Sequence, residues 1–402
     1  RPGQVVSIEG DYSPNACSLL LALIGRGAIV VPLTESVKAH REEFLNIAET
    51  QVAIVFDHAD HWQVQYCNGV VKNALTRSLI ESHESGLVLF SSGSTGKPKA
   101  SLHNMTQFLL KFHSLRKPLR TVGVPPPDHV AGLDSLFYTF SSGGMLICIP
   151  DRAPSIVCQA IERHKVELLP ASATFFRLLL ISEAYRQFDL SSLRIVAYGS
   201  ELMPENTLAR LREIFPNSKF VQKYGTTELG SPRTKSKEDG SLWLKIDSEG
   251  FETKVIDDVL WIRAQSAMMG YLNAPNSLDE EGWFNTEDVV EVDGEFMRFR
   301  GRDSEIINVG GEKVFPTEVE SVLLQMDNVK DATVCGESNS ILGNIVVAKI
   351  NLVEPENLPS LRKRVREFCR DRMAPYKVPI KIEVSEDPQF SARLKKMRPV
   401  KL

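Results

Sequence analysis

The sequence predicts an α/β protein in which a large N-terminal region with doubly wound sheets is followed by a small C-terminal α+β domain. Short apolar strands and one helix alternate between Gln4 and Phe56, in the strand–helix–strand order of a parallel sheet. Polar, glycine-containing turns follow the apolar strands Leu87–Phe90 and Leu193–Ala197, at the strand ends where open α/β sheets bind ligands. From Thr317 onward, helices and strands mix in the manner of a compact α+β unit.

The composition limits the classes of protein to consider. The 402 residues are 43% hydrophobic and 24% charged, which is ordinary for a globular protein of two or three domains. The net charge of −4 argues against a general nucleic-acid partner, and no apolar run approaches the ~18 residues of a membrane span. Without a signal peptide at Arg1, we expect a cytoplasmic protein. The six cysteines contain no C-x-x-C pair, which predicts reduced thiols and no zinc site.

Local patterns predict the individual elements. Asn15 is expected to cap the first helix, Pro204 fits the start of another, and Asp257-Asp258 form the turn of a hairpin. The predicted strands are Gln4–Glu9, Ala28–Pro32, Val52–Phe56, Leu87–Phe90, Met145–Ile149, Leu193–Ala197, Lys219–Lys223, Val329–Cys335, Ile345–Ile350 and Ile380–Val384, with a hairpin over Thr253–Ala264. The predicted helices are Ala16–Ile24, Leu102–Phe112, Ser172–Ile181, Glu205–Phe215, Thr317–Gln325 and Leu361–Arg372. Asp57–Ser85 carries no clear signal, and Ser231–Gly250 is expected to form loops.

The first chemical motif is the polar run SSGSTGKPK, which directly follows the strand Leu87–Phe90. Its two glycines free the backbone for turns, and its hydroxyl and ammonium groups suit a polyphosphate. It is not a P-loop, because only Ser94 and Thr95 separate Gly93 from Gly96-Lys97, and Pro98 follows. By composition alone it also fits a flexible surface loop.

The second motif, Tyr224–Glu228 (YGTTE), follows the strand Lys219–Lys223. A buried strand end that carries a tyrosine, two hydroxyls and a carboxylate needs an occupant, because unpaired buried polar groups are costly. A tight turn with Glu228 facing solvent is the alternative interpretation.

These motifs, in this order, resemble those of the adenylate-forming superfamily, which includes acyl-CoA ligases, aryl acid ligases, luciferases and adenylation domains. The resemblance covers nearly the whole chain, although relatives usually begin several tens of residues earlier, so the chain is either truncated or a compact variant. It implies an ATP-dependent carboxylic acid ligase that uses Mg²⁺. Such an enzyme forms an acyl-adenylate, releases pyrophosphate, and then makes a thioester with CoA.

The resemblance also assigns roles to residues. It places ATP against Ser91, Ser92, Gly93, Ser94, Thr95, Gly96, Lys97, Lys99, Gly199, Ser200, Glu201, Tyr224, Gly225, Thr226, Thr227, Asp288 and Arg302. It places the acid against His129, Gly132, Leu133, Tyr198, Gly199, Gly225 and Leu229. Glu228 is expected to bind Mg²⁺, and the catalytic set comprises Lys395, Glu228, Thr227 and His129. One glutamate is enough, because Mg²⁺ uses few carboxylates alongside substrate phosphates.

The resemblance further divides the chain into a domain over 1–301, which binds ATP and the acid, and a mobile lid over 302–402. Ser304 stands at the hinge, and Gly310 and Gly311 open a channel for a phosphopantetheine arm. Lys395 fits the register of the catalytic lysine, with Lys396 as a possible substitute. The chain departs from the family at Ala100, Glu287 and Leu394, where glycine is usual, and at Ser304, where Asp or Lys is common.

Three questions stay open at this stage. The acceptor is CoA or a separate acyl carrier protein, since the arginine-rich helix Leu361–Arg372 suits either. Loss of turnover, leaving an acyl-adenylate-binding homologue, is a further alternative that Leu394 and Ser304 favour. The acid is expected to be a small aromatic or short acyl acid, because Tyr198 and His129 would crowd a long chain.

Overall fold

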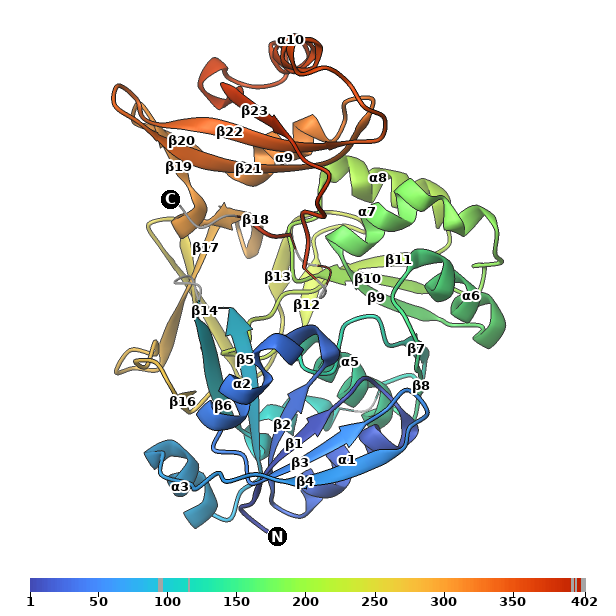
Figure 1. Cartoon of the computed structure of the whole chain (residues 1–402), viewed down its shortest axis with the longest axis vertical. Coiled ribbons are helices and arrows are strands. Elements are labelled where there is room, and N and C mark those ends of the chain that lie inside the picture. Colours follow the sequence, from blue (N-terminus) through green and yellow to red (C-terminus); the bar gives the residue numbers. More distant parts are fainter. Residues whose placement is uncertain (93–96, 115, 392–393, 395, 399–402) are drawn as a thin grey trace.

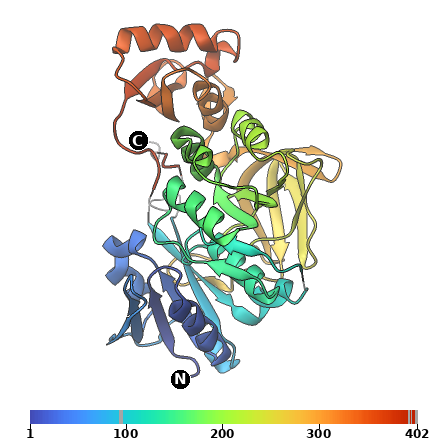
Figure 2. The same cartoon turned by 90° about the vertical axis from the view of Figure 1, so that its right-hand side faces the viewer.

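The computed structural model describes residues 1–92, 97–114, 116–391, 394 and 396–398 (Figure 1). The described chain forms four β-sheets, and the first three lie in the part of the molecule that precedes Asp303. The last sheet forms a separate layer at one end of the molecule, above the helices of the second sheet (Figures 1 and 2). A large sheet-rich N-terminal region and a smaller C-terminal unit confirm the predicted fold class.

The first sheet has seven strands in the order β16-β6-β5-β2-β1-β3-β4. The pairs β1–β2, β1–β3 and β2–β5 are parallel, as the alternating pattern at the N-terminus predicts. Its strands are β1 (Val5–Glu9), β2 (Ile29–Leu33), β3 (Val52–Phe56), β4 (Trp62–Tyr66), β5 (Gly86–Ser92), β6 (Pro98–Asn104) and β16 (Gly270–Tyr271). The intervening helices are α1 (Pro14–Gly25), η1 (Glu35–His40), α2 (Arg41–Ile47), α3 (Ala74–Glu81), α4 (Met105–Leu109) and η2 (Leu110–Phe112).

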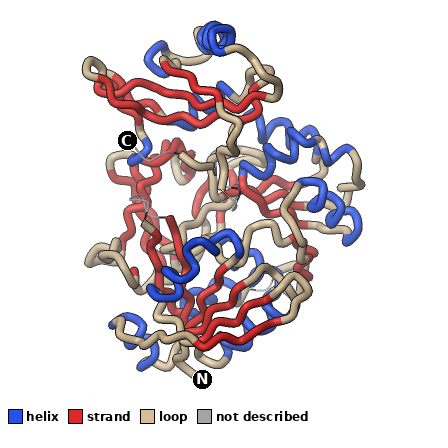
Figure 3. The backbone as a smooth tube through the Cα atoms, viewed as in Figure 1, coloured by secondary structure: helices blue, strands red, loops and turns tan. Residues whose placement is uncertain are grey.

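The second sheet has five strands, all parallel, in the order β11-β10-β9-β7-β8. They are β7 (Arg120–Val122), β8 (Met145–Ile147), β9 (Leu168–Ser172), β10 (Ile195–Gly199) and β11 (Lys219–Gln222). The helices between them are α5 (Val130–Ser141), α6 (Pro154–His164), α7 (Ala173–Ser182), η3 (Ala184–Arg186) and α8 (Glu205–Ile214). Buried side chains from these helices and strands form one continuous core, and the helices flank the strands in Figure 3.

The third sheet is antiparallel, with six strands in the order β12-β13-β18-β17-β15-β14. They are β12 (Thr234–Ser236), β13 (Leu244–Ile246), β14 (Phe251–Ile256), β15 (Val259–Ala264), β17 (Trp283–Asp293) and β18 (Phe296–Arg302). The hairpin β14–β15 turns at Asp257 and Asp258, as predicted, and both residues have positive φ, which aspartate tolerates better than most residues.

The fourth sheet has its own core of buried side chains. It comprises β19 (Ile307–Val309), β20 (Glu312–Val314), β21 (Val329–Asn339), β22 (Gly343–Leu352) and β23 (Lys381–Val384). The short helices η4 (Asp303–Glu305) and η5 (Pro375–Lys377) and the helices α9 (Pro316–Leu323) and α10 (Leu358–Cys369) accompany it. The predicted division at 301/302 falls at the end of β18, directly before η4.

Three local predictions are wrong, each for a physical reason, and one segment without a clear signal proves to be structured. Ser13, not Asn15, caps α1, because the Ser13 hydroxyl accepts the Ala16 N–H. The predicted helix Leu102–Phe112 begins only at Met105, because residues 98–104 pair with β5 as the strand β6. The segment 57–85 contains β4 and α3, and the segment 231–250 contains β12 and β13. β4 pairs with β3, and β12 pairs with β13, which also pairs with the more distant β18. Cross-strand pairing stabilises these strands, and a local pattern does not reveal it.

The six cysteines are all unpaired, in agreement with the prediction of reduced thiols. Burial raises the pKa of Cys17 and Cys158 to about 12 and that of Cys148 and Cys369 to about 11. Within the described ranges, the structure holds no helix long and apolar enough to cross a membrane. Nor do the described residues form a group of three or more His, Cys, Asp or Glu side chains that could hold a metal ion.

Candidate active site

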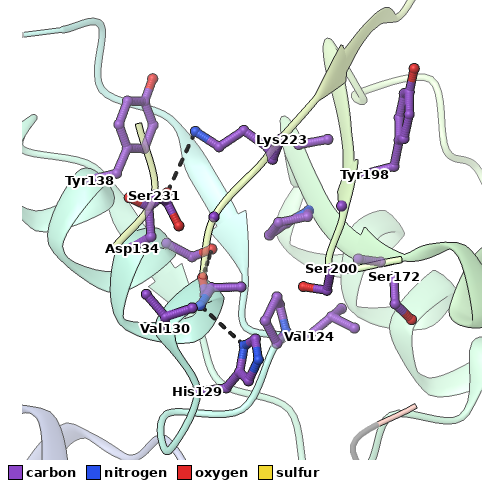
Figure 4. A pocket seen from close by; sticks show the side chains of 18 of the residues that line it. Val124, His129, Val130, Asp134, Tyr138, Ser172, Tyr198, Ser200, Lys223 and Ser231 are labelled. Carbon is purple, nitrogen blue, oxygen red and sulfur yellow. Dashed lines mark hydrogen bonds and ion pairs between the residues drawn. The ribbon is translucent and has the colours of Figure 1, made fainter. Parts of the chain in front are cut away.

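A cavity of about 210 Å³ lies among the carboxyl ends of β9, β10 and β11, the start of α5 and the C-terminal tail. This position agrees with the rule that ligands bind outside the carboxyl ends of parallel strands. Apolar side chains form much of its wall, among them Val124, Ala131 and Leu394. Figure 4 shows the polar side chains in two groups, with Lys223, Asp134, Tyr138 and Ser231 at one end and Ser200, Ser172 and His129 toward the other.

Only part of the predicted acid-binding set borders this cavity. His129 lines it, and the His129 Nδ1 atom accepts the Ala131 N–H at 3.2 Å, so the imidazole also caps α5. Gly132, Leu133 and Leu229 do not border the cavity, which corrects the prediction. Leu133 and Leu229 are buried in apolar clusters, and a Cβ at Gly132 would lie 1.9 Å from the Pro126 carbonyl oxygen. These three residues are therefore explained by packing.

The turn after β10 contributes Tyr198, Gly199 and Ser200 to the wall of the cavity. The Tyr198 ring also packs in the core of the second sheet, and its hydroxyl lies 3.4 Å from the Ser241 carbonyl oxygen. Gly199 has no room for a side chain, since a Cβ would lie 2.6 Å from the Lys223 carbonyl oxygen. Glu201 caps α7 by accepting the Thr174 N–H at 2.9 Å.

Tyr224, Asp288 and Arg302 form one connected group at the edge of the cavity. The Tyr224 hydroxyl donates to Asp288 Oδ2 at 2.8 Å, and Arg302 Nε lies 3.5 Å from Asp288 Oδ1. The Tyr224 ring stacks on Phe299 with a centroid distance of 4.7 Å. Burial raises the pKa of Asp288, although Arg302 and the Tyr224 hydroxyl oppose this shift. The antiparallel pairing of β17 with β18 places Asp288 opposite Arg302 and so builds this group.

The rest of the YGTTE motif is held by the hairpin β5–β6 and by β16. His103 Nε2 on β6 donates to the Thr227 carbonyl at 2.8 Å, and burial lowers the His103 pKa to about 4, so its imidazole is neutral. The Tyr271 hydroxyl donates to Glu228 Oε1 at 2.8 Å. Thr226 serves the turn itself, because its hydroxyl accepts the Leu229 N–H. The Glu228 carboxylate is therefore held by Tyr271, and the Lys99 ammonium lies 5.2 Å from the centre of the Tyr271 ring.

The glycine-rich loop connects β5 to β6. Gly93, Ser94, Thr95 and Gly96 lie outside the described residues, as does Lys395. Ser91 and Lys99 face each other as a pair of the antiparallel ladder, and Ser92 pairs with Pro98. The strand therefore extends beyond the predicted end at Phe90. Lys97 is exposed at the end of the loop.

The C-terminal tail reaches from the fourth sheet to the cavity. The Leu394 side chain packs against the core of the second sheet, and its carbonyl accepts the Ser172 hydroxyl at 2.7 Å. Leu394 has a φ of 52°, so it keeps the left-handed backbone that usually requires glycine. The Lys396 ammonium pairs with Asp331 and is nearly buried, with its side chain 8% exposed. An ammonium held in this pair is not directed into the cavity, which weighs against Lys396 as a substitute for Lys395.

A group of charges at one end of the cavity is not apparent from any single motif. The Asp134 carboxylate on α5 pairs with Lys111 and lies 3.5 Å from the Lys223 ammonium. Burial favours a higher pKa for Asp134, but Lys111 and Lys223 hold it below its ordinary value. Arg116 also lines this end, with its guanidinium 5.1 Å from the centre of the Tyr138 ring. No spacing in the sequence links these residues, because they come from η2, the loop after it, α5 and the end of β11.

Comparison with known protein families decides the affiliation of the chain. The family model described as AMP-binding enzyme matches residues 1–272, and the model of its C-terminal domain matches residues 318–392. The chain belongs to the AMP-binding enzyme family. Acyl-CoA ligases are among its relatives, in agreement with the resemblance inferred from the motifs.

Curated relatives of this AMP-binding enzyme are similar at a moderate level. The indoleacetate–CoA ligase of Aromatoleum aromaticum is 27% identical over 321 residues, covering 73% of this chain and 62% of the relative. The medium-chain fatty-acid–CoA ligase of Escherichia coli is 28% identical over 347 residues, covering 79% and 61%. The chain spans about three fifths of the length of the curated relatives it matches.

Solved structures share the fold over almost the whole chain. An anthranilate CoA ligase in complex with anthranoyl-AMP superposes with a TM-score of 0.82 at 22% identity, covering 98% of this chain and 86% of the other. The o-succinylbenzoate CoA synthetase of Bacillus subtilis in complex with ATP and magnesium ion gives a TM-score of 0.78 at 22% identity, covering 98% and 88%. At this level of identity, the comparison supports the architecture and not the substrate.

Proposed function

We propose that this AMP-binding enzyme is an ATP-dependent carboxylic acid ligase. It joins the acid to AMP as an acyl-adenylate with release of pyrophosphate, and then transfers the acyl group to the thiol of CoA. The observation that carries the proposal is that Tyr224, which is joined to Asp288 and through it to Arg302, and the tail residue Leu394 line one cavity. We also propose a cytoplasmic location, because the reaction consumes ATP and CoA.

The residues fit ATP and Mg²⁺. Asp288 offers carboxylate oxygens for the ribose hydroxyls, and Tyr224 has an aromatic ring beside the cavity for the adenine. Glu228 supplies one carboxylate, which is the number that Mg²⁺ commonly uses alongside phosphates. When bound, Mg²⁺ neutralises negative charge on the phosphates. The loop around Thr95, together with Lys97 and Lys99, would receive the departing phosphates.

The chemistry requires the protein chiefly to position charges. The acid carboxylate attacks the α-phosphorus, the bond to the pyrophosphate oxygen breaks, and the electron pair leaves with pyrophosphate. Thr227 and Lys395 are proposed to stabilise the charge at the reacting oxygens. Thiol attack on the acyl carbon then expels AMP. Ser304 as the hinge and Gly310 and Gly311 as the thiol channel are part of this proposal, since both glycines have positive φ and no Cβ.

Glu228→Gln tests the proposal directly. The amide is a poorer ligand for a hard cation, so the magnesium concentration for half-maximal pyrophosphate exchange should rise at least tenfold, with the melting temperature unchanged. Glu252→Gln, on the exposed strand β14, is the matched control. An unchanged magnesium dependence would remove Glu228 from the metal site.

A separate acyl carrier protein is the alternative acceptor. The exposed basic side chains of α10, among them Arg362 and Lys363, would suit an acidic carrier as well as the phosphates of CoA. Thioester yield with CoA and with a carrier bearing its pantetheine arm, at equal concentrations, decides between the two. Pyrophosphate exchange without either thioester would leave an adenylate-releasing enzyme.

A further inference from the structure

One end of the active-site cavity carries a concentration of positive charge that the adenylation chemistry does not use. Lys111 and Lys223 contact the carboxylate of Asp134, and Arg116 lines the same end, so three cations share this region with one carboxylate. Lys111 also donates to the Ser231 carbonyl. Because Lys111 and Asp134 are nearly buried, with side chains 11% and 13% exposed, their pairing satisfies both charges inside the protein.

The other two cations are left with capacity for a ligand. Among the described residues, Arg116 forms no ion pair, and its guanidinium lies against the Tyr138 ring. The Lys223 ammonium is 3.5 Å from Asp134 Oδ2, a loose contact, and its side chain is 35% exposed. Both side chains line the cavity, and Figure 4 shows the end of Lys223 beside Tyr138, Asp134 and Ser231.

The positions of the two polar groups define a direction through the cavity. Ser200, Ser172 and Leu394 lie at the end where the tail enters. Under the proposed function, we assign the meeting of the reacting carboxylate with the nucleotide to this end. The cations lie at the end formed by α5 and β11. The wall between them is mostly apolar, and a volume of about 210 Å³ suits an acid of about one ring, since an apolar cavity of ~150 Å³ already holds benzene.

We propose that this AMP-binding enzyme selects a carboxylic acid with a second anionic group, held by Arg116 and Lys223 at the far end of the cavity. A compact, apolar body joins the two acidic ends of this substrate. The inference rests on the proposed function, because it assigns the substrate class of the same site. Arg116 and Lys223 are thus specificity-determining residues. Lys111 supports them indirectly, because its ion pair with the Asp134 carboxylate leaves the other two cations available for the substrate.

Binding of stable acyl-adenylate mimics tests the inference without requiring turnover. Three sulfamoyl-adenosine probes carry a benzoyl group whose para substituent is a carboxylate, a methyl or an aminomethyl group. Titration calorimetry should show the carboxylate probe binding about 10- to 100-fold more tightly than the methyl probe, the range expected for hydrogen bonds to a charged group. Arg116→Gln and Lys223→Gln should each remove most of this preference while leaving the affinity for the methyl probe within about threefold.

Matched controls lie nearby. Lys219→Gln removes a charge from the start of the same strand, and Arg210→Gln removes an exposed guanidinium from α8, and both should retain the preference. Melting temperatures verify that each variant is folded. Equal binding of the carboxylate and methyl probes to the wild type overturns the inference and leaves the proposed function intact. Tighter binding of the aminomethyl probe also overturns it, because Asp134 would then be the receptor. Failure of all three probes to bind overturns the proposed function itself.

Discussion

Asp331 is the residue whose removal should most clearly disturb the arrangement of the C-terminal unit over the active site. It lies on β21, and its Oδ1 atom accepts from the Arg177 guanidinium on α7 at 2.9 Å and from the Lys396 ammonium of the tail. Their side chains are between 8% and 13% exposed, so this is a buried cluster. Burial alone would raise the pKa of Asp331, but Arg177 and Lys396 lower it.

Asp331→Asn keeps a side-chain oxygen that can accept the hydrogen bond from the Ala332 N–H. It leaves the buried Arg177 and Lys396 cations without a carboxylate partner. Removing one partner of a buried pair costs ~3–5 kcal/mol, and we take ~3 kcal/mol because Glu320 remains near Lys396. The free energy of unfolding should fall by about this amount in urea. Pyrophosphate exchange should fall by up to about 100-fold, because the tail loses its anchor at the cavity. Thioester formation from supplied acyl-adenylate should change much less.

The pH dependence has a defined sign. Because the folded pKa of Asp331 is depressed, its stabilisation is complete above the ordinary aspartate pKa of about 3.9 and is lost as the pH falls through the lower folded value. The stability difference between wild type and Asp331→Asn should therefore vanish toward strong acid. Asp327→Asn, an exposed aspartate of the same unit, is the control. If both variants match the wild type in stability and exchange, the cluster does not hold the tail.

Three further predictions concern the tail, the hinge and the third sheet. Lys395→Ala should lower pyrophosphate exchange ~10²–10³-fold at an unchanged melting temperature. Lys396→Ala should instead lower the melting temperature, because the ion pair with Asp331 is lost. If Lys395→Ala leaves exchange unaffected, the catalytic role belongs to another residue. Ser304→Pro should permit adenylation but block thioester formation, because proline fixes the backbone φ near −65° and the hinge residue must change its φ between the two half-reactions. Equal loss of both half-reactions in a folded protein would contradict this prediction. Glu287→Gly should raise the unfolding free energy by about 1 kcal/mol in urea, because the half-buried Glu287 has a left-handed φ of 59° that glycine adopts without strain. A lower stability would show that its 3.1 Å contact with Ser304 matters more.

The sequence predicts the parts of the site that are local in the chain. The strand before SSGSTGKPK and the strand before YGTTE both form, because an apolar run ended by glycine-containing polar residues specifies a strand and a turn by itself. The departures at Glu287 and Leu394 are visible in the sequence, but only the structure shows that both residues keep a left-handed backbone.

What depends on distant pairing could not be predicted. Lys111, Asp134 and Lys223 lie far apart in the sequence, and each alone is indistinguishable from a surface charge. His103 belongs to a segment predicted to be helical, so its contact with Thr227 became apparent only when β6 paired with β5. The family resemblance places Leu133 and Leu229 in the acid pocket. Their apolar side chains instead fill cores on the far side of the same elements.

The state of the thiols has a practical consequence for following the reaction. The pKa of about 11 or 12 at Cys17, Cys148, Cys158 and Cys369 leaves fewer than about one of these groups in a thousand as thiolate near neutral pH. The pKa values of Cys67 and Cys335 are raised as well. Since disulfide reagents react with thiolates, the protein should react slowly with a chromogenic disulfide. When samples of the reaction are mixed with the reagent, the released colour should therefore come from residual free CoA and should fall as CoA is consumed. The same protection should slow inactivation of the enzyme by peroxide.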